Sequence, residues 1–530
     1  MSTVRDAVHR LLLDHGITRV FGNPGSTEVR FFRDWPDELD YVLGLQEASV
    51  VAMADGFAQA SGQVGVAVVH SAAGLGHGLG SLYTAERNQT PLLVIAGQQT
   101  RSLLGHDPYL FARDAEQFPR PYAKYAVEPS CPEQVPDAIA EALRIARQAP
   151  AGPVFVSVPE DDWDRPFTGA VAVTERPARP AVDPDLDALV TALDDAVRPA
   201  LVLGAAVEAG GGRSAAVELA ERLGADVFTA PLAGRASFPE DHPRFAGFLQ
   251  PVAALIRDQL DPYDVVLVAG APVFTVHVPS EGPPVGPDTR LFHLTDDPRQ
   301  IERAMAGEAV VAAAGVGLGM LADRVHARPQ ATPSASVDRP APAPVRAPDG
   351  ALAPERVFDV LDRLAPEDAV FVEEAPTHRN AMHRHLTVGQ CRRFHVAASG
   401  SLGWGMPAAV GIALARPDDT VICVIGDGSS LYSIQALWTA AQRGARVLFV
   451  VLDNGGYAAM KAFGRRLGVP DAPGLDLPGV AIGTVAEGFG VGAAAVASPD
   501  ELEAALQRGL ETVGPSLVTV RVGAAAEDLY

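Results

Sequence analysis

Short runs of apolar, mostly β-branched residues recur along the chain, and most of them end at a glycine or a polar turn. Runs of this length are typical of strands that are buried on both faces of a sheet. Segments with helical periodicity lie between them, and this alternation predicts parallel sheets covered by helices. The clearest runs are residues 65–69, 92–96, 154–158, 200–204, 264–269, 421–425, 447–452 and 516–522. The pattern therefore predicts an α/β protein with doubly wound parallel sheets.

The length of the chain and one proline-rich stretch indicate several domains. With 530 residues the chain is too long for a single hydrophobic core, so we expect roughly two to four domains. Residues 328–350 are rich in proline, alanine and serine and lack hydrophobic periodicity. This composition is typical of an extended linker between domains.

Composition also limits the partners and the compartment. The net charge of −23 argues against nucleic acid and anionic membranes as partners. No apolar run approaches the roughly 18 residues of a membrane span, and residues 1–16 have the pattern of a charged amphipathic helix rather than a signal peptide. The three cysteines form no CxxC pair. We therefore expect a cytoplasmic protein.

One β-α-β unit in the last third carries polar turns where its strands end. We expect a buried strand at 421–425, a helix at about 431–443 and a second buried strand at 447–452. The turn Gly-Asp-Gly at 426–428 follows the first strand, and the turn Asp-Asn-Gly-Gly at 453–456 follows the second. In open parallel sheets, ligands bind at these carboxyl ends of the strands.

The residues in these two turns are suited to a metal ion and phosphate. Asp427 offers a carboxylate oxygen and Asn454 offers an amide oxygen, and Mg²⁺ prefers about six oxygen ligands that include substrate phosphates. A helix that starts near the first turn would direct its amino end at the same place, which favours a phosphate. A single such turn could belong to an ordinary β-α-β unit, but the pair predicts a Mg²⁺–diphosphate site.

In the first third, three polar side chains follow three different expected strands. Ser26, Glu47 and His70 each lie just beyond the carboxyl end of a strand, so the fold would gather them at one rim. Taken singly, Ser26 could cap a helix that we expect from Glu28 to Phe32, Glu47 could be a solvated first-turn acid, and His70 could be structural. Together they are typical of a site.

The middle third repeats the α/β pattern and offers one candidate residue. The glycines at 210–212 invite a dinucleotide interpretation, but no GxGxxG opens a helix there with an acidic residue at the right distance. His277 follows the strand at 264–269, and it is the residue of this region that we expect to be functional.

Several longer motifs, spread over nearly the whole chain, occur together in one known enzyme family. They are VFGNPGSTE (20–28), LQEASVVAMADGFAQAS (45–61), HSAAGLG (70–76), GPVFVSVPEDDWD (152–164), GDGSSLYSIQALWTAAQ (426–442) and DNGGYAAM (453–460). With them the chain resembles the thiamin-diphosphate-dependent 2-oxo-acid decarboxylases, most closely those of the benzoylformate decarboxylase type.

The resemblance implies a three-domain organisation and a shared active site. It implies an amino-terminal pyrimidine-binding domain at 1–180, a central domain at 181–327, the linker at 328–350 and a diphosphate-binding domain at 351–530. The cofactors are thiamin diphosphate and Mg²⁺, with Ca²⁺ as an alternative. The cofactor would lie between the first domain of one subunit and the last domain of another, so a homodimer is the smallest active unit and a homotetramer is common.

The resemblance also implies roles for individual residues. Glu47 matches the glutamate that hydrogen-bonds the aminopyrimidine ring and promotes the imino tautomer, which leads to the thiazolium ylid and, after loss of CO₂, the enamine. His70 and His277 match two histidines that move protons during the reaction, for which their near-neutral pKa is suited. Ser26 matches the serine that holds the substrate carboxylate.

The remaining residues implied by the resemblance fall into three sets. The metal ligands are Asp427, Asn454 and the carbonyl of Gly456. The other cofactor-binding residues are Thr377, Gly400, Leu402, Gly426, Gly428, Ser429 and Tyr457. The residues of the acyl pocket are Leu110, Pro376, Val396, Ala459, Met460 and Phe463.

Four positions depart from the family pattern. Asp453 stands where a second asparagine is usual, next to the expected ligand Asn454. Pro376 replaces a hydroxyl residue, Val396 replaces an aromatic pocket residue, and His77 replaces an asparagine. Since Pro376 and Val396 would lie close to the substrate, the pocket could prefer another aryl or branched 2-oxo acid.

The expected reaction is non-oxidative decarboxylation of an aryl or related 2-oxo acid to an aldehyde and CO₂. The first alternative is a thiamin-dependent carboligase or lyase, acetolactate-synthase-like or benzaldehyde-lyase-like, which the pair His70 and His277 disfavours. The remote alternative is a non-catalytic paralogue, which predicts loss of Glu47 or of a metal ligand, and none is lost.

Overall fold

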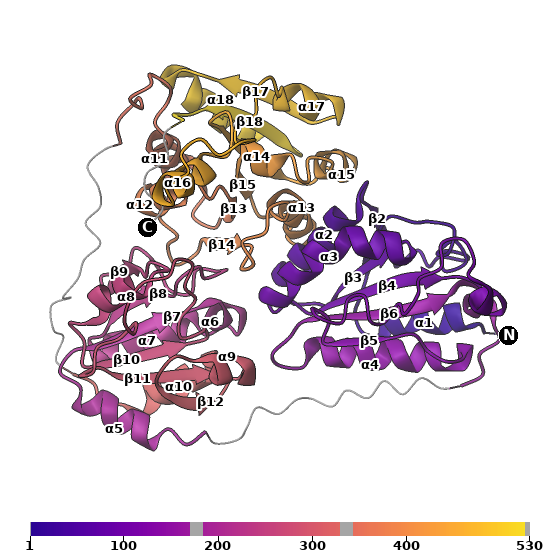
Figure 1. The fold of residues 1–530 in the computed structure, drawn as a ribbon, viewed down its shortest axis with the longest axis horizontal. Coiled ribbons are helices and arrows are strands. Elements are labelled where there is room, and N and C mark those ends of the chain that lie inside the picture. The colour runs from indigo at the N-terminus through magenta and orange to yellow at the C-terminus, as the bar shows by residue number, and fades with distance from the viewer. Residues whose placement is uncertain (1, 170–183, 329–342, 525–530) are drawn as a thin grey trace.

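The computed structural model describes residues 2–169, 184–328 and 343–524. These residues form three six-stranded sheets, each covered by helices (Figure 1). Every strand pair in the three sheets is parallel, as the sequence pattern predicted. The α/β prediction with three doubly wound sheets is confirmed. Within the described residues, no helix is long and apolar enough to cross a membrane.

The first sheet has the strand order β2-β1-β3-β4-β6-β5. Its strands are β1 (Arg19–Gly22), β2 (Asp40–Leu43), β3 (Gly65–Val69), β4 (Leu92–Gln98), β5 (Tyr125–Val127) and β6 (Pro153–Pro159). Its helices are α1 (Val4–Asp14), α2 (Glu47–Ser61), α3 (Ser71–Arg87) and α4 (Val135–Arg147). Since β3, β4 and β6 are buried along their whole length, helices must cover both faces.

The second sheet has the order β12-β11-β10-β7-β8-β9. Its strands are β7 (Pro199–Leu203), β8 (Asp226–Thr229), β9 (Phe245–Phe248), β10 (Val265–Ala269), β11 (Arg290–Thr295) and β12 (Glu308–Val311). Its helices are α5 (Asp187–Asp195), α6 (Ala205–Ala209), α7 (Arg213–Leu223), α8 (Ala253–Leu260), α9 (Pro298–Arg303) and α10 (Ala314–Arg324).

The third sheet has the order β14-β13-β15-β16-β18-β17, which repeats the order of the first sheet. Its strands are β13 (Val370–Glu374), β14 (Arg393–Val396), β15 (Val421–Gly426), β16 (Val447–Asp453), β17 (Gly492–Val496) and β18 (Ser516–Arg521). Its helices are α11 (Pro354–Leu364), α12 (Arg379–His385), α13 (Gly405–Ala415), α14 (Asp427–Ser430), α15 (Ala436–Arg443), α16 (Ala458–Arg466), α17 (Ile482–Gly488) and α18 (Pro499–Glu511).

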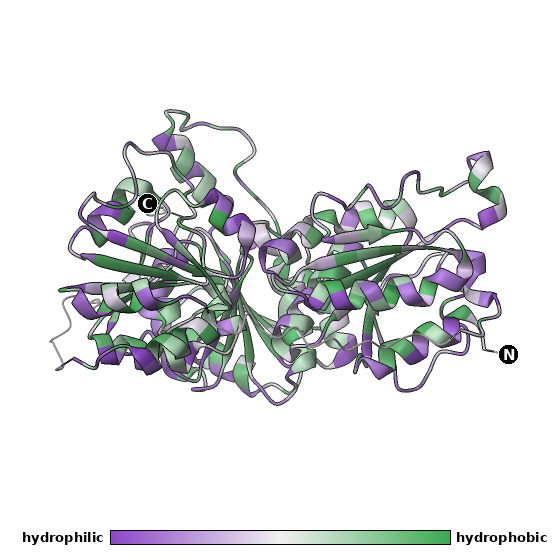
Figure 2. Ribbon diagram, turned by 90° about the horizontal axis from the view of Figure 1, so that it is seen from below, coloured by the Kyte–Doolittle hydropathy of each residue, from purple (hydrophilic) through white to green (hydrophobic). Residues whose placement is uncertain are grey.

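Helices α2 and α13 join the first and third sheets into one hydrophobic core. Two glycines allow the close approach, because a Cβ at Gly56 would overlap the backbone of Ala408, and a Cβ at Gly411 would overlap the backbone of Met53. Apolar strands run through the interior while polar residues lie on the outer helices (Figure 2). Within one chain, the first and third sheets are therefore packed together through α2 and α13.

The expected helix from Glu28 to Phe32 is wrong, because the chain forms consecutive turns there. Phe31 N–H donates to the Glu28 carbonyl and Phe32 N–H to the Val29 carbonyl, each three residues back rather than four. The Glu28 side chain is buried and bonds to residues outside this segment, which fixes the turn in place of a helix.

The helix expected at 431–443 forms only from residue 436 onward. The chain forms the four-residue helix α14, then turns, and then α15. Ser430 Oγ donates to the Asp427 carbonyl at 2.7 Å, and a serine hydroxyl that bonds the backbone in this way competes with regular helix bonding. The amino end that would face a phosphate therefore belongs to a single helical turn.

The predicted domain boundaries stay predictions. The boundary between 180 and 181 and residues 329–342 of the predicted linker lie outside the described residues. The three sheets occupy residues 19–159, 199–311 and 370–521, which lie within the three predicted domains.

Candidate active site

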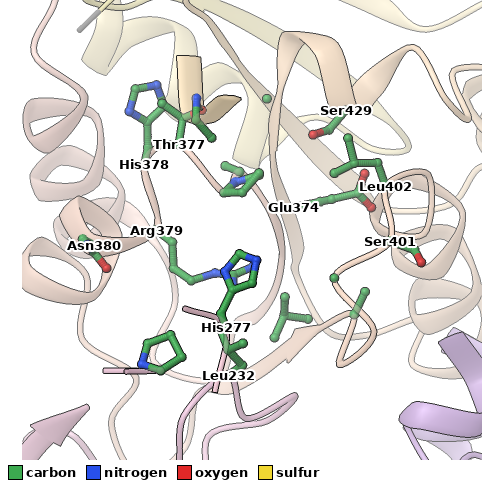
Figure 3. A pocket seen from close by; sticks show the side chains of 18 of the residues that line it. Leu232, His277, Glu374, Thr377, His378, Arg379, Asn380, Ser401, Leu402 and Ser429 are labelled. Atoms are coloured by element: carbon green, nitrogen blue, oxygen red, sulfur yellow. Dashed lines mark hydrogen bonds between the residues drawn. The ribbon is translucent and has the colours of Figure 1, made fainter. Parts of the chain in front are cut away.

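One cavity of about 850 Å³ lies where the carboxyl ends of strands from the second and third sheets meet. Sixteen of the twenty predicted site residues line it, and Ser26, Glu47, His70 and Leu110 do not. Figure 3 shows Leu402 and Ser429 on one side of the cavity, Thr377 and His378 on the other, and His277 near Leu232. The sixteen are His277, Pro376, Thr377, Val396, Gly400, Leu402, Gly426, Asp427, Gly428, Ser429, Asn454, Gly456, Tyr457, Ala459, Met460 and Phe463.

The turns after β15 and β16 place oxygen ligands side by side, because the two strands are paired in register. The Asp427 carboxylate accepts hydrogen bonds from the backbone N–H groups of Gly428 at 2.8 Å, Gly455 at 2.8 Å and Gly456 at 2.9 Å. Burial raises the pKa of Asp427, and a bound cation would offset that effect. Asn454 is buried beside it and lines the same cavity.

Two glycines in these turns allow the backbone to come close to a ligand. Gly456 has φ +155°, and a Cβ there would overlap the carbonyl of Leu475. A Cβ at Gly428 would press on the ring of Tyr457 at 2.6 Å. Side chains are excluded at both points, so the backbone itself forms this wall of the cavity.

Glu374 is a site residue that the sequence reasoning missed. It ends β13, and its carboxylate accepts hydrogen bonds from the N–H groups of Gly403 at 2.7 Å, Trp404 at 2.9 Å and Gly405 at 2.5 Å. Burial raises the pKa of Glu374 to about 7. The residue fixes the loop that carries Gly400 and Leu402, and its place at the end of a buried strand was the available signal.

His378 is a second residue that was missed. Its side chain is buried, it lines the cavity, and its Nε2 lies 3.3 Å from Nδ2 of Asn454. Burial lowers the pKa of His378 to about 4, so the ring is neutral at pH 7 and its Nε2 can accept from the Asn454 amide. The Asn454 oxygen accepts from the Gly456 N–H at 3.2 Å and keeps a second lone pair for another partner.

The part of the cavity next to the second sheet contains the predicted acyl pocket. The ring of His277 packs edge-on to Phe463 with centroids 5.1 Å apart, and the His277 N–H donates to the Pro251 carbonyl at 2.8 Å. Val396 ends β14 and is buried at the cavity wall. Arg379 also lines this region, and it forms an ion pair of 2.8 Å with the fully buried Glu373.

The other predicted catalytic residues gather at the rim of the first sheet. Ser26, Glu47 and His70 follow β1, β2 and β3, which are neighbours in that sheet. Ser26 is exposed, whereas the side chains of Glu47 and His70 are 14% and 20% exposed. The chain therefore carries two separate sets of site residues, one at this rim and one in the cavity.

Glu28 organises the rim and was also missed. Its carboxylate lies 2.9 Å from His70 Nδ1 and accepts from the N–H groups of Gly25 at 2.9 Å and Gly97 at 2.8 Å. Its contact with Nδ1 of His70 fixes the ring, so that Nε2 is the ring nitrogen outside this contact. Glu28 closes the motif that contains Ser26, and this was the signal for it.

Leu110 lies in the loop after β4 and has φ +64°, in the left-handed region. Its carbonyl accepts a hydrogen bond of 2.7 Å from the hydroxyl of Ser71, the residue after His70. The predicted pocket residue Leu110 thus belongs to the rim set and not to the cavity.

Models of the thiamine pyrophosphate enzyme family match the chain in three places. The N-terminal TPP binding domain matches residues 2–118, the central domain matches residues 186–321, and the C-terminal TPP binding domain matches residues 375–520. Thiamine pyrophosphate is another name for thiamin diphosphate. The three matches follow the order of the three sheets along the chain.

Individual relatives are similar over almost their full length. Benzoylformate decarboxylase of Pseudomonas aeruginosa is 42% identical over 525 residues, which are 98% of this chain and 99% of that protein. The structure of the 4-hydroxybenzoylformate decarboxylase of Rhodococcus jostii RHA1 has a TM-score of 0.96 and 38% identity, and covers 99% of this chain and 100% of its own. Benzoylformate decarboxylase from Polynucleobacter necessarius has a TM-score of 0.95, 36% identity and the same coverage.

Fold, cavity and comparisons define a thiamin-diphosphate enzyme, and the chain belongs to the thiamine pyrophosphate enzyme family. Within that family it groups with the 2-oxo-acid decarboxylases and is similar to benzoylformate decarboxylases. The resemblance read from the motifs is thereby confirmed.

The cavity fits a diphosphate with a divalent cation. A carboxylate, an amide and glycine backbone meet there, and these are ligands that Mg²⁺ accepts together with phosphate oxygens. Within the residues that the structure describes, no group of three or more His, Cys, Asp or Glu could hold a metal. An ion at Asp427 would complete its shell with the Asn454 amide, a backbone carbonyl and the cofactor.

Proposed function

We propose that the protein converts an aryl 2-oxo acid such as benzoylformate into an aldehyde and CO₂. The observation that carries the proposal is that Asp427, Asn454 and His277 line one cavity. The Asp427–Asn454 pair would hold a metal and diphosphate there. The relatives with the highest identity and TM-scores quoted above are decarboxylases of benzoylformate or 4-hydroxybenzoylformate, which supports an aryl substrate.

We propose that Asp427, Asn454 and the carbonyl of Gly456 bind Mg²⁺, with Ca²⁺ able to take the same place. Thr377, Ser429 and the backbone of Gly426 and Gly428 would bind the diphosphate. The buried Asp427 supports this assignment, since its carboxylate already faces a cluster of backbone N–H groups rather than a basic side chain.

When bound, thiamin diphosphate supplies a nucleophilic carbon and an electron sink for the carbanion left by CO₂. The protein's own residues would do the rest. Glu47 holds a proton at the pyrimidine ring, the backbones of Gly400 and Leu402 and the side chain of Tyr457 orient the cofactor, and Ser26 binds the substrate carboxylate. His70 and His277 carry protons to and from the substrate.

We propose that two chains complete each other's active site. The rim set of Ser26, Glu47, His70 and Leu110 does not line the cavity of its own chain. Exposed apolar side chains surround both parts, among them Val29, Leu45 and Tyr109 beside the rim and Tyr432 and Met460 beside the cavity. Burial of these side chains against a second copy would favour a homodimer, and two such dimers would give a homotetramer.

A cytoplasmic location also stays a prediction.

The test is aldehyde and CO₂ formation from benzoylformate with added thiamin diphosphate and Mg²⁺. We expect fast aldehyde release by the wild type, and a loss of about 10²- to 10⁴-fold in Glu47→Gln, which removes a proton-transfer group, with cofactor binding nearly intact. An acyloin as the main product at modest substrate concentration would instead favour the carboligase alternative. No product with bound cofactor would contradict the aryl substrate.

A further inference from the structure

The carboxylate of Glu47 contacts helix α3. Glu47 is the first residue of α2, and its Oε2 lies 3.0 Å from Nδ1 of His77 in α3. Its Oε1 lies beside Gly74, where a Cβ would approach it to 3.1 Å. Among the described residues, no other group donates a hydrogen bond to this carboxylate.

The contact is part of the packing interface between helices α2 and α3. Gly74, His77, Gly78 and Ser81 share one face of α3, at the spacing of a helix. A Cβ at Gly78 would press on Val51 of α2 at 3.1 Å, and Ser81 Oγ donates to the Ala48 carbonyl at 2.8 Å. This face fixes the first turn of α2, and His77 is the member of it that reaches the carboxylate.

We propose that His77 is a positioning residue that directs one oxygen of Glu47 toward the cofactor, a role that rests on the proposed function of Glu47. A hydrogen bond from Nδ1–H to Oε2 prevents rotation of the carboxyl group and leaves Oε1 as the oxygen for the pyrimidine nitrogen. It also stabilises the negative charge of the carboxylate, because a hydrogen bond to an ionised acceptor is stronger than a hydrogen bond to a neutral acceptor. An asparagine at this position could donate in the same way, but an apolar side chain could not.

The test measures exchange of the thiazolium C2 proton of bound thiamin diphosphate with deuterium, by rapid quench and NMR. The matched pair is His77→Asn and His77→Leu, which have nearly the same shape but differ in the donor. We expect exchange in His77→Leu to be slower by on the order of 10-fold, the worth of a hydrogen bond to a charged group. We expect His77→Asn to restore most of the rate.

Two further readouts separate positioning from a structural role. The dissociation constant of thiamin diphosphate and the thermal midpoint should be the same in both variants. In the Glu47→Gln background the change from His77 to Leu should slow exchange no further, because the two residues act as one unit. The proposal would be overturned if His77→Leu slowed exchange as much in the Glu47→Gln background as in the wild type. Equal exchange rates in His77→Asn and His77→Leu would also overturn it.

The outcomes also distinguish the two levels of the argument. If Glu47→Gln exchanges as fast as the wild type, the proposed function of Glu47 fails. If Glu47→Gln is slow but His77→Leu is normal, only the role of His77 fails. If His77→Leu assembles poorly, the pair His77→Gln and His77→Met also compares a hydrogen-bond donor with an apolar side chain of similar shape. The exchange rates of this pair then test the proposal.

Discussion

At the scale of single residues, two buried carboxylates of the cavity have backbone N–H groups as their partners. Asp427 and Glu374 each accept three backbone N–H bonds, and neither forms an ion pair with a basic side chain of the described residues. Backbone donors fix the position of a carboxylate without cancelling its charge. Asp427 can therefore face a cation, while Glu374 holds the loop that we propose to contact the cofactor.

Removal of the Asp427 carboxylate should remove the cofactor. Asp427→Ala deletes the one ionised ligand expected for the metal, so purified protein should retain almost no thiamin diphosphate even with added Mg²⁺. The cofactor content can be measured as thiochrome fluorescence. The control is Asp453→Ala, which loses the same charge nearby but pairs with Arg521 at 2.9 Å rather than lining the cavity. A stoichiometric cofactor in Asp427→Ala would refute the metal assignment.

The size of the acyl pocket should depend on Val396. Phenylalanine at this buried position of the cavity wall fills space that a ring substituent could use. We expect Val396→Phe to lower kcat/KM for 4-substituted benzoylformates by about 10-fold relative to benzoylformate itself. The measurement is the ratio of the two kcat/KM values, with Val396→Ala as the opposite change. An unchanged ratio in both variants would place Val396 outside the acyl pocket.

At the scale of elements, α2 and α3 connect the rim of the first sheet to a loop that lines the cavity of the same chain. Helix α2 begins at Glu47 and buries Asp55, which accepts from Trp404 Nε1 at 2.7 Å. Helix α3 follows His70 and ends at Arg87, and the next residue, Asn88, accepts a hydrogen bond from the Ala398 N–H through its Oδ1 at 3.0 Å. Both helices thus link the rim to the glycine-rich loop at 397–404.

The crossing of α2 and α13 should be sensitive to a single methyl group. Gly411→Ala places a Cβ against the backbone of Met53 and Phe57, and overpacking of this kind costs about 1–3 kcal/mol. We expect a lower free energy of unfolding in urea or guanidinium. Gly488→Ala is the control, because no atom lies within 4 Å of its Cβ position. Equal stability of the two variants would contradict the packing argument.

The sequence predicted the elements whose structure follows from their own run of residues. It missed those that depend on a contact with a residue far away along the chain. Strand β3 could be read at its observed bounds because a run of apolar residues suits burial on both faces. The turn at Glu28 could not, because its bond to His70 joins residues 42 positions apart. The same reason hid His378 and Glu374, while Asp427 and Asn454, which line the cavity, could be predicted from their turns.

At the scale of the whole molecule, buried neutral histidines should make stability depend on pH. Burial lowers the pKa of His9 to about 4 and the pKa values of His383 and His395 to about 3, from 6.5. As pH falls below about 6.5, the unfolded chain binds protons that the folded chain does not, so the free energy of unfolding should decrease. Above that pH the contribution is fully present.

Denaturation at pH 7.5 and 5.5 measures this effect. Each such histidine should contribute a slope of at most about 1.4 kcal/mol per pH unit. A His395→Asn variant should show a shallower pH dependence than the wild type, because one of these protons is no longer involved. Identical slopes would mean that His395 is not neutral in the folded protein.

The two separate sets of site residues make the shared active site the central claim for the whole molecule. A variant such as Glu47→Gln damages only the rim, and Asp427→Ala damages only the cavity. In a mixed dimer, one active site carries both changes and the other carries neither. The two variants can be co-expressed with different tags, so that mixed oligomers are isolated.

The decisive measurement is aldehyde formation from benzoylformate by the co-expressed mixture. Each variant alone should be nearly inactive, and random pairing should restore about one quarter of wild-type activity, since half of the dimers are mixed and each has one intact site. No recovery, with mixed oligomers demonstrated through their tags, would show that each chain builds its active site alone.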